Sequence, residues 1–543
     1  MSDSYRQPVF LISVALVLLL VIVGALIPET FGAAAQAGLD WATRVFGWFF
    51  LLSMFGFVCA LVYLGFSRHG DTRLGPPDSQ PEFSYYAWVA MLLAAGFGIG
   101  LVFYGVAEPM SHLNDPPHGM AEPGSAQAAE LAIQYSFFNW GISQWAAFSI
   151  VGLIIGFFQF RKGQPGLVSV VLEPALSRLR FRRQIAGGLD VFAVVATVIG
   201  IATSLGLGVL QVNGGLAFRY GIAEGFAAQA TILGVMVIAY MISTATGLEK
   251  GIRLLSTINL TIALGLMAFV LIFGPTVAIL DIMVQGFGDY LQHFIFMSLQ
   301  TDPYSDSTWA GSWTIFYWAW VIAWSPFVGT FIARISYGRT IREFILGVLI
   351  VPPLLACVWM AVFGGAALEL DAAQDGALAA AVAENVTFSL FRFFEFLPFS
   401  GLLSILGVTL IFIFLITSAD SASYVVAQLT DRGSAEAPLA KRLIWGILIA
   451  AICLTLIATG GLEALQAAAI LAALPFILVL YAMLAMLFRS LNLDRQQQLA
   501  QLYEENNQTP VGASLEEARQ MTGDDDPLAT AGLRSDDNAP VQP

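Results

Sequence analysis

The sequence predicts an all-α polytopic membrane protein, from its composition, its apolar runs and the distribution of its charges. Of its 543 residues, 57% are hydrophobic and only 11% are charged, whereas soluble proteins carry about 25% charged residues. Apolar runs recur at about the 20-residue length that a helix needs to cross a bilayer. We expect twelve spans, with approximate bounds 9–28, 46–66, 86–106, 130–157, 190–215, 227–246, 254–277, 308–333, 341–366, 399–427, 441–459 and 464–488.

The positive charges support this arrangement. If both termini face the cytoplasm, only Arg44, Arg219 and Arg392 of the 24 Lys and Arg residues lie outside. That asymmetry follows the positive-inside rule and indicates a multi-pass protein of a bacterial cytoplasmic (inner) membrane. We interpret the first span as a retained helix, because its apolar run is longer than the core of a signal peptide.

Several classes of function are disfavoured. Cys59, Cys357 and Cys453 lie within apolar runs and predict no disulfide framework. The four histidines form no metal-ligand pattern and accompany no catalytic motif, so we expect neither an enzyme nor a bound cofactor beyond a coupling ion. The tail, residues 491–543, holds ten acidic and three basic residues. It predicts a largely disordered cytoplasmic segment and no nucleic-acid partner.

Three glycines, Gly96, Gly98 and Gly100, interrupt the third span at alternate positions. Each weakens a helix by up to about 1 kcal/mol relative to Ala, and unpaired backbone survives in a membrane only where it lines a cavity or faces protein. Pro326 is expected to break or kink the eighth span. Two interrupted helices, each opening a block of five spans, favour an inverted-repeat transporter. Close helix packing is the alternative for the glycines, although a spacing of two weakens it.

The interpretation as an inverted-repeat transporter divides the chain into five parts. Residues 1–85 contain the two leading helices, and residues 86–277 form the first repeat. Residues 278–307 form an amphipathic segment along the outer membrane face, because they include the run DIMVQGFGDYLQHF. The second repeat covers residues 308–490, and the tail covers residues 491–543.

Aromatic side chains form stripes on the fourth and eighth spans. Trp140, Trp145 and Phe148 fall within an arc of roughly 140° on a continuous helix, and helical spacing also relates Trp320 and Trp324. Core packing would explain one such stripe, but here there are two, on opposite repeats. No acidic residue is expected beside them. Aromatic faces hold a quaternary ammonium at about 0.5–2 kcal/mol per ring, and free glycine amides can hold a carboxylate. The pattern predicts a small zwitterionic substrate with a methylated ammonium.

The stretches GFGIGLVFYGVAEP, WGISQWA, ATSLGLG, WSPFVGTFIARISYGRTIREF and TSADSASY together resemble the betaine/carnitine/choline transporter family over about residues 9–488. The resemblance implies a LeuT-type fold of two inverted five-helix repeats after two leading helices, alternating access, and a homotrimer in the lipid bilayer. It implies import of a zwitterion such as glycine betaine, carnitine or dimethylsulfoniopropionate, coupled to sodium. The alternatives are proton-coupled choline uptake and cation-independent substrate/product antiport.

The resemblance also implies site residues. Those for the substrate are Trp140, Trp145, Phe148, Trp320, Val321, Trp324, Gly96, Gly98, Gly100 and Ser204. Phe148 stands where the family usually has Tyr, Val321 where it usually has Trp, and Asn139 where His commonly precedes the first Trp. These departures imply a wider or differently shaped pocket and favour a bulkier methylated or sulfonium substrate over glycine betaine itself.

A sodium site is implied in the same way. Its ligands would be the carbonyls of Ala94, Phe97 and Phe414 and the hydroxyls of Thr417 and Ser418. The alternative is that these hydroxyls bond back to their own helix. A second sodium site would involve Thr197 and Phe327, but Ile201 replaces a Thr ligand, so we expect that site to be altered or lost.

Two intramembrane acids remain. We expect Asp420 to pair with Arg334 or Arg339 as a gate-like contact, with helix capping as the alternative. We expect Glu108 to be structural, at the outer end of a third helix that Pro109 terminates.

Overall fold

The computed structural model describes residues 6–96, 98–246, 249–305, 307–431, 433–434 and 437–508. It confirms an all-helical membrane protein, and these residues form no strand beyond one isolated bridge. The chain divides into two compact units, Met1–Tyr481 and Ala482–Pro543. The prediction of a disordered tail concerns mostly residues 509–543, which lie outside the described residues.

Within the described residues, ten helices are long and apolar enough to cross a membrane, or eleven if one bent pair counts as a span. The number of twelve therefore stays a prediction. The last two expected spans lie within one element, whose backbone leaves helical geometry at Gly460 and Gly461. The α-helices are α1 (Arg6–Leu26), α2 (Pro28–Phe66), α3 (Tyr85–Gly96), α4 (Ile99–Asn114), α5 (Ala126–Trp140), α6 (Ile142–Gly156), α7 (Val168–Leu176), α8 (Arg182–Tyr220), α9 (Phe226–Thr246), α10 (Glu249–Phe273), α11 (Thr276–Leu299), α12 (Phe316–Ile335), α13 (Ile341–Met360), α14 (Ala366–Ala372), α15 (Ala377–Glu384), α16 (Ser389–Glu395), α17 (Ser400–Thr430) and α18 (Leu439–Gln508).

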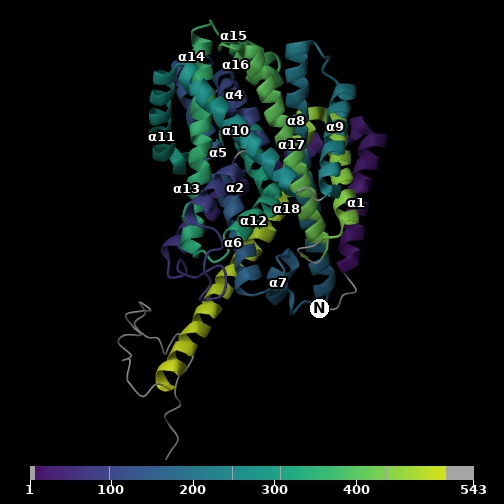
Figure 1. The fold of residues 1–543 in the computed structure, drawn as a ribbon, viewed down its shortest axis with the longest axis vertical. Coiled ribbons are helices and arrows are strands. Elements are labelled where there is room, and N and C mark those ends of the chain that lie inside the picture. The colour runs from purple at the N-terminus through teal and green to yellow at the C-terminus, as the bar shows by residue number, and fades with distance from the viewer. Residues whose placement is uncertain are drawn as a thin grey trace, which may run out of the picture. The chain divides into compact units, whose positions relative to one another are not determined.

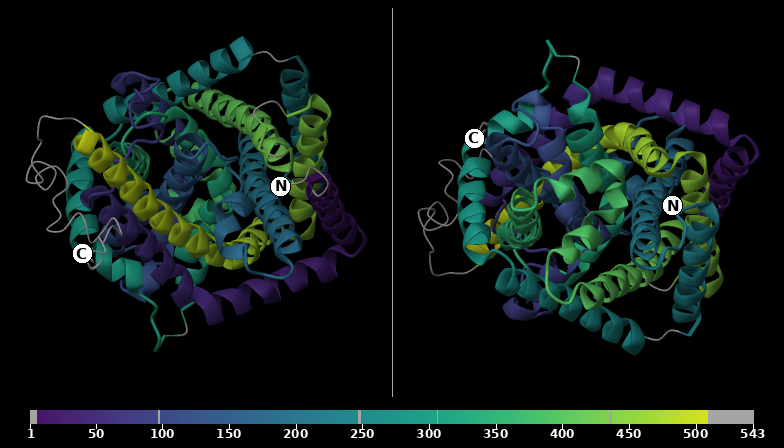
Figure 2. Two further views of the ribbon diagram at one scale, coloured as in Figure 1. Left: turned by 90° about the horizontal axis from the view of Figure 1, so that it is seen from below. Right: turned by 90° about the horizontal axis from the view of Figure 1, so that it is seen from above.

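Helices α5, α6, α8 and α12 form the interior of the first unit. Most residues of α5, α6 and α8 are buried, and α12 packs against both α6 and α8. The long helices α8 and α17 run side by side (Figure 1). The leading pair, α1 and α2, lies at the edge of the bundle (Figure 2), and α1 is mostly exposed there. An apolar helix with little buried surface is what a lipid-facing position requires.

The predicted interruption of the third span is present. Helix α3 ends at Gly96, α4 begins after Gly98, and the two helices are bent by 58°. Gly98 has extended backbone angles, φ −151° and ψ 170°, and caps α4. Phe97 lies outside the described residues. The first N–H groups of α4 therefore have no partner within a preceding helical turn.

A break at Pro326, one of the two outcomes expected there, is absent, the expected helix end at Pro109 is absent, and the fourth span has an unexpected break. Helix α12 is not broken at Pro326, because the Ile322 carbonyl that the proline leaves free accepts a hydrogen bond from Ser325 Oγ at 2.7 Å. Pro109 does not terminate the third span either, since α4 continues to Asn114. In contrast, the fourth span is not continuous: α5 ends at Trp140, and α6 begins after Gly141.

The break at Gly141 has a clear physical cause. A side chain at this position would place its Cβ 2.4 Å from the Phe137 carbonyl oxygen and 2.5 Å from the Tyr290 hydroxyl oxygen. The Tyr290 hydroxyl, from α11, accepts the Ile142 amide at 3.0 Å. A side chain distant in sequence thus satisfies a backbone donor that the break leaves free.

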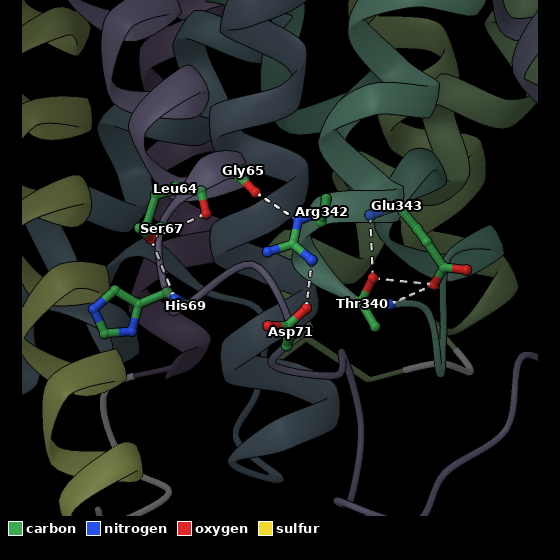
Figure 3. Close-up of polar contacts among 8 residues, drawn as sticks. All are labelled: Leu64, Gly65, Ser67, His69, Asp71, Thr340, Arg342 and Glu343. Atoms are coloured by element: carbon green, nitrogen blue, oxygen red, sulfur yellow. Dashed lines mark hydrogen bonds and ion pairs between the residues drawn. The ribbon is translucent and has the colours of Figure 1, made fainter. Parts of the chain in front are cut away.

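The GRTIREF segment ties α13 to the loop after α2. Thr340 and Glu343 form a reciprocal capping box at the start of α13. Arg342 donates from Nε to the Gly65 carbonyl at 2.9 Å and from Nη1 to Asp71 Oδ1 at 2.6 Å (Figure 3). This contact fixes the loop that leads into α3 and its break.

Candidate functional site

The helix break contacts two of the predicted tryptophans directly. A Cβ atom added at Gly100 would lie 2.2 Å from Cη2 of Trp320 and 2.8 Å from Cη2 of Trp140. The two indole rings meet edge to face, with centroids 6.3 Å apart. Only a residue without a side chain fits between α4 and these rings, so the glycine at position 100 has a steric role in addition to weakening the helix.

The other predicted aromatic residues form a second group. Trp145 and Phe148, both on α6, pack edge to face at 5.3 Å, and Phe148 packs on Trp324 of α12 at 6.1 Å. Trp324 in turn contacts Phe327 at 5.4 Å. The stripes of the fourth and eighth spans therefore do meet, although the break at Gly141 separates Trp140 from the other two residues of its stripe.

Helix α8 supports the α12 tryptophans. Trp320 Nε1 donates to Ser204 Oγ at 3.0 Å. A Cβ at Gly200 would lie 3.0 Å from the backbone nitrogen of Trp324, so the two helices pack closely at this level. Thr197 is buried and its hydroxyl bonds to the Ala193 carbonyl of its own helix, and Val321 is buried as well.

A cavity of about 920 Å³ brings together most of the predicted sodium ligands. Its lining includes Ala94 of α3 and Phe414, Thr417 and Ser418 of α17, together with Trp324 and Phe327 of α12. The remaining predicted ligand, Phe97, lies outside the described residues. Among the described residues, the Trp324 indole N–H meets no hydrogen-bond acceptor. It is a donor available to a bound molecule.

The Thr417 hydroxyl bonds back to its own helix, as the alternative reading held. It donates to the Ile413 carbonyl at 3.0 Å and lies 3.2 Å from the Phe414 carbonyl. A hydroxyl that donates in this way keeps its lone pairs, so it can still accept a cation. The geometry is compatible with both readings.

The expected gate-like pairing of Asp420 is wrong. Asp420 accepts a hydrogen bond from Thr244 of α9 instead. Arg334 forms a two-point ion pair with Glu82, in the loop before α3, with Nη2 2.9 Å from Oε1. The Arg334 hydrogen bond lowers the pKa of Glu82. Arg339 donates to the Phe83 carbonyl at 2.9 Å. Both arginines therefore hold the loop before α3 and do not contact the acid in α17.

Sequence reasoning missed an acid beside the aromatic residues. Glu108 is fully buried, and Trp140 Nε1 donates to its Oε2 at 2.7 Å. Tyr317 of α12 donates to the same oxygen at 2.6 Å, and Asn139 Nδ2 donates to Oε1 at 2.9 Å. The expectation of an acid-free box is wrong because α4 packs the Glu108 carboxylate against Trp140 of α5 and Tyr317 of α12.

Broken helices around buried aromatic rings, beside a large cavity in a bundle of apolar helices, are typical of a membrane transporter. The comparisons agree with this class. A family model described as "BCCT, betaine/carnitine/choline family transporter" matches residues 8–496. The chain belongs to this family and is a transporter, not an enzyme.

Curated relatives match nearly the full chain. The ectoine/hydroxyectoine transporter of Virgibacillus pantothenticus is 49% identical, with 90% of this chain and 97% of that protein covered. The glycine betaine transporter OpuD of Bacillus subtilis (strain 168) is 44% identical, with 91% and 96% covered. The osmo-dependent choline transporter BetT2 of Acinetobacter baylyi is 36% identical, with 92% and 73% covered.

Proposed function

We propose that this protein imports a small zwitterion with a cationic head group and a carboxylate, by alternating access and coupled to sodium. The observation that carries the proposal is the contact of the broken third span with Trp140 and Trp320 at Gly100. Rings supply faces for the cation. The N–H groups at the start of α4 supply donors for the carboxylate. The cationic and the anionic end of the substrate would thus be bound by the aromatic rings and by the start of α4, which lie next to each other.

The relatives narrow the substrate class. The relatives at 49% and 44% identity are named as transporters of ectoine with hydroxyectoine and of glycine betaine, respectively. Val321 stands where the family usually has Trp, and the smaller side chain favours a head group broader than trimethylammonium. We therefore propose that ectoine, carnitine and dimethylsulfoniopropionate bind as well as glycine betaine or better.

Sodium coupling rests on the residues that line the cavity. Ala94 lies at the end of α3, and Thr417 and Ser418 lie on α17, so neutral oxygens from two helices face the same space. Hard oxygen ligands suit an alkali cation. An ion between α3 and α17 would link substrate binding at the break to the position of α17. We do not extend the proposal to Thr197, because Ile201 stands where that second site would have a Thr ligand.

Choline is the second candidate, favoured by the buried carboxylate of Glu108. A cation without a negative group of its own, such as choline, binds more tightly beside a negative charge. A zwitterion already carries a negative group. We propose the zwitterion first because the amides at the α4 terminus call for an anionic group. We also propose, from the family, an inner-membrane location with both termini cytoplasmic, and a homotrimer that crosslinking in membranes would test.

Uptake into proteoliposomes distinguishes these substrates. Labelled glycine betaine, ectoine, carnitine, dimethylsulfoniopropionate and choline would be compared with an inward sodium gradient and with potassium in its place, at clamped pH. We expect sodium-dependent accumulation of at least one zwitterion and little of choline. Accumulation of choline alone, driven by a pH gradient, would replace the proposal with the second candidate. Uptake that needs only a counter-substrate would indicate antiport.

A further inference from the structure

The carboxylate of Glu108 makes an unusually complete set of contacts for a buried acid. Oε2 accepts the Trp140 indole N–H at 2.7 Å and the Tyr317 hydroxyl at 2.6 Å. Oε1 accepts Asn139 Nδ2 at 2.9 Å. The side chain is fully buried. A buried acid is costly unless its oxygens are satisfied, and here donors from α5 and α12 satisfy both of them.

These donors make both oxygens of Glu108 hydrogen-bond acceptors. An indole N–H can only donate, so Oε2 must accept. Asn139 itself is held by a second contact, since its Oδ1 accepts the Thr314 hydroxyl at 3.0 Å. Each carboxylate oxygen therefore accepts a hydrogen bond from a donor on another helix. His112, one turn along α4, places its Nε2 3.3 Å from Oε1.

The charge acts on the ring that contacts the helix break. An anion that accepts an indole N–H hydrogen bond pushes electron density into the ring. The face of the ring becomes more negative, and cation–π attraction depends on that negative potential. The effect is strongest where water is excluded, and Trp140 is only 5% exposed.

We propose that Glu108 is a specificity-determining residue that polarises Trp140 and thereby selects substrates with a cationic head group. The inference rests on the proposed function, because it deepens the role of the same aromatic site. It assigns Glu108 a task beyond holding helices together. A purely structural acid would position the ring equally well for a neutral head group of the same shape.

The test compares ligands that carry a cationic head group, called charged, with ligands of the same shape whose head group is uncharged, called neutral. Glycine betaine is paired with 3,3-dimethylbutanoate, and choline with 3,3-dimethylbutan-1-ol, in which a carbon replaces the ammonium nitrogen. Competition binding to the full-length purified protein gives the ratio of charged to neutral affinity within each pair. Glu108→Gln keeps the shape and one acceptor oxygen but removes the charge. We expect this ratio to fall by about fivefold, with the neutral affinity nearly constant.

Tyr317→Phe is the matched control. It removes one hydrogen bond to the same carboxylate oxygen but leaves both the charge and the Trp140 contact, so the ratio should keep its wild-type value. Equal losses for charged and neutral ligands in Glu108→Gln, or the same fall of the ratio in Tyr317→Phe, would overturn the inference. If Glu108→Gln does not fold, Trp140→Phe replaces it. That variant keeps a ring but loses the N–H, and an unchanged ratio would again overturn the inference.

The proposed function fails in a different way. If the wild-type protein binds none of the charged probes, the aromatic site is not a receptor for cationic head groups, and both statements fall together. If it binds them and only the ratio in Glu108→Gln is unchanged, the transport proposal stands and the role of Glu108 is structural.

Discussion

Replacing Gly100 with Ala should disturb the aromatic site without touching any ring or polar group. The new Cβ would lie 2.2 Å from Cη2 of Trp320 and 2.8 Å from Cη2 of Trp140, both far inside van der Waals contact. Both rings are almost fully buried. Trp320 is also held by Ser204, and Trp140 by Glu108. Neither ring can yield without losing packing or a hydrogen bond.

The magnitude follows from the cost of overpacking. Inserting one methyl group into a tightly packed core costs about 1–3 kcal/mol. If the rings shift to accommodate it, substrate affinity should fall by roughly 5- to 150-fold, at about 1.4 kcal/mol for each factor of ten. If they do not shift, the same energy should appear as a lower unfolding temperature. Isothermal titration with the preferred zwitterion and thermal unfolding in detergent together measure both outcomes.

Gly98→Ala is the control for this experiment. Gly98 has an extended backbone that any residue adopts, and a Cβ there meets no atom within 4 Å. Affinity and stability should therefore stay near wild-type values. Wild-type affinity and stability in Gly100→Ala as well would refute the placement of the two tryptophans against the break.

Three further predictions concern the pocket, the coupling ion and the loop before α3. Val321→Trp should shift preference toward smaller substrates such as glycine betaine at the expense of bulkier ones, and a uniform loss in competition uptake would indicate simple overpacking. Thr417→Ala should raise the sodium concentration for half-maximal uptake and, by linkage, weaken apparent substrate affinity at low sodium; an unchanged sodium curve would leave that hydroxyl with its bond to Ile413 alone. Because Arg334 lowers the pKa of Glu82, their pair should stabilise the fold above the ordinary carboxyl pKa and lose this effect as pH falls through the lowered value. Glu82→Gln should therefore reduce the free energy of unfolding at pH 7 by less than about 1 kcal/mol, since the pair is half-exposed. The unfolding curves of the variant and the wild type should converge in acid. If the difference in stability persists in acid, the ion pair is not the source of that difference.

Local patterns revealed the parts of the site that lie on one helix at regular spacing. The alternate glycines predicted the break between α3 and α4, because no other residue type weakens a helix so much at so little steric cost. The aromatic spacing on α12 correctly placed Trp320 and Trp324 toward the fourth span, where Trp320 contacts Trp140 and Trp324 contacts Phe148. The positive charges and the apolar runs established a multi-pass membrane protein.

Side-chain contacts that no sequence pattern marks, one of them local and the others between distant helices, decided the rest. Ser325 supplies the hydrogen bond that lets α12 continue through Pro326, whereas Gly141 breaks the fourth span with the help of Tyr290 from α11. No pattern in the local sequence around Gly141 indicates that the Tyr290 hydroxyl lies beside it. Glu108 was misread for the same reason, since its importance depends on where α5 and α12 place Trp140 and Tyr317. The one local signal available was the position of Glu108 eight residues beyond Gly100, which places both on the same face of a helix that continues.

The central claim is that a zwitterion binds at the aromatic rings beside the helix break and is transported together with sodium. One uptake measurement tests this claim most directly. Proteoliposomes containing the wild-type protein, Trp140→Ala or Trp41→Ala would take up the preferred labelled zwitterion under an inward sodium gradient. Trp41 is 49% exposed on α2 and serves as the matched control. The account predicts sodium-driven uptake by the wild type and Trp41→Ala, and a loss of about thirtyfold in apparent affinity for folded Trp140→Ala, from about 2 kcal/mol for one desolvated ring. Equal uptake by all three proteins, or wild-type uptake that ignores sodium, would contradict it.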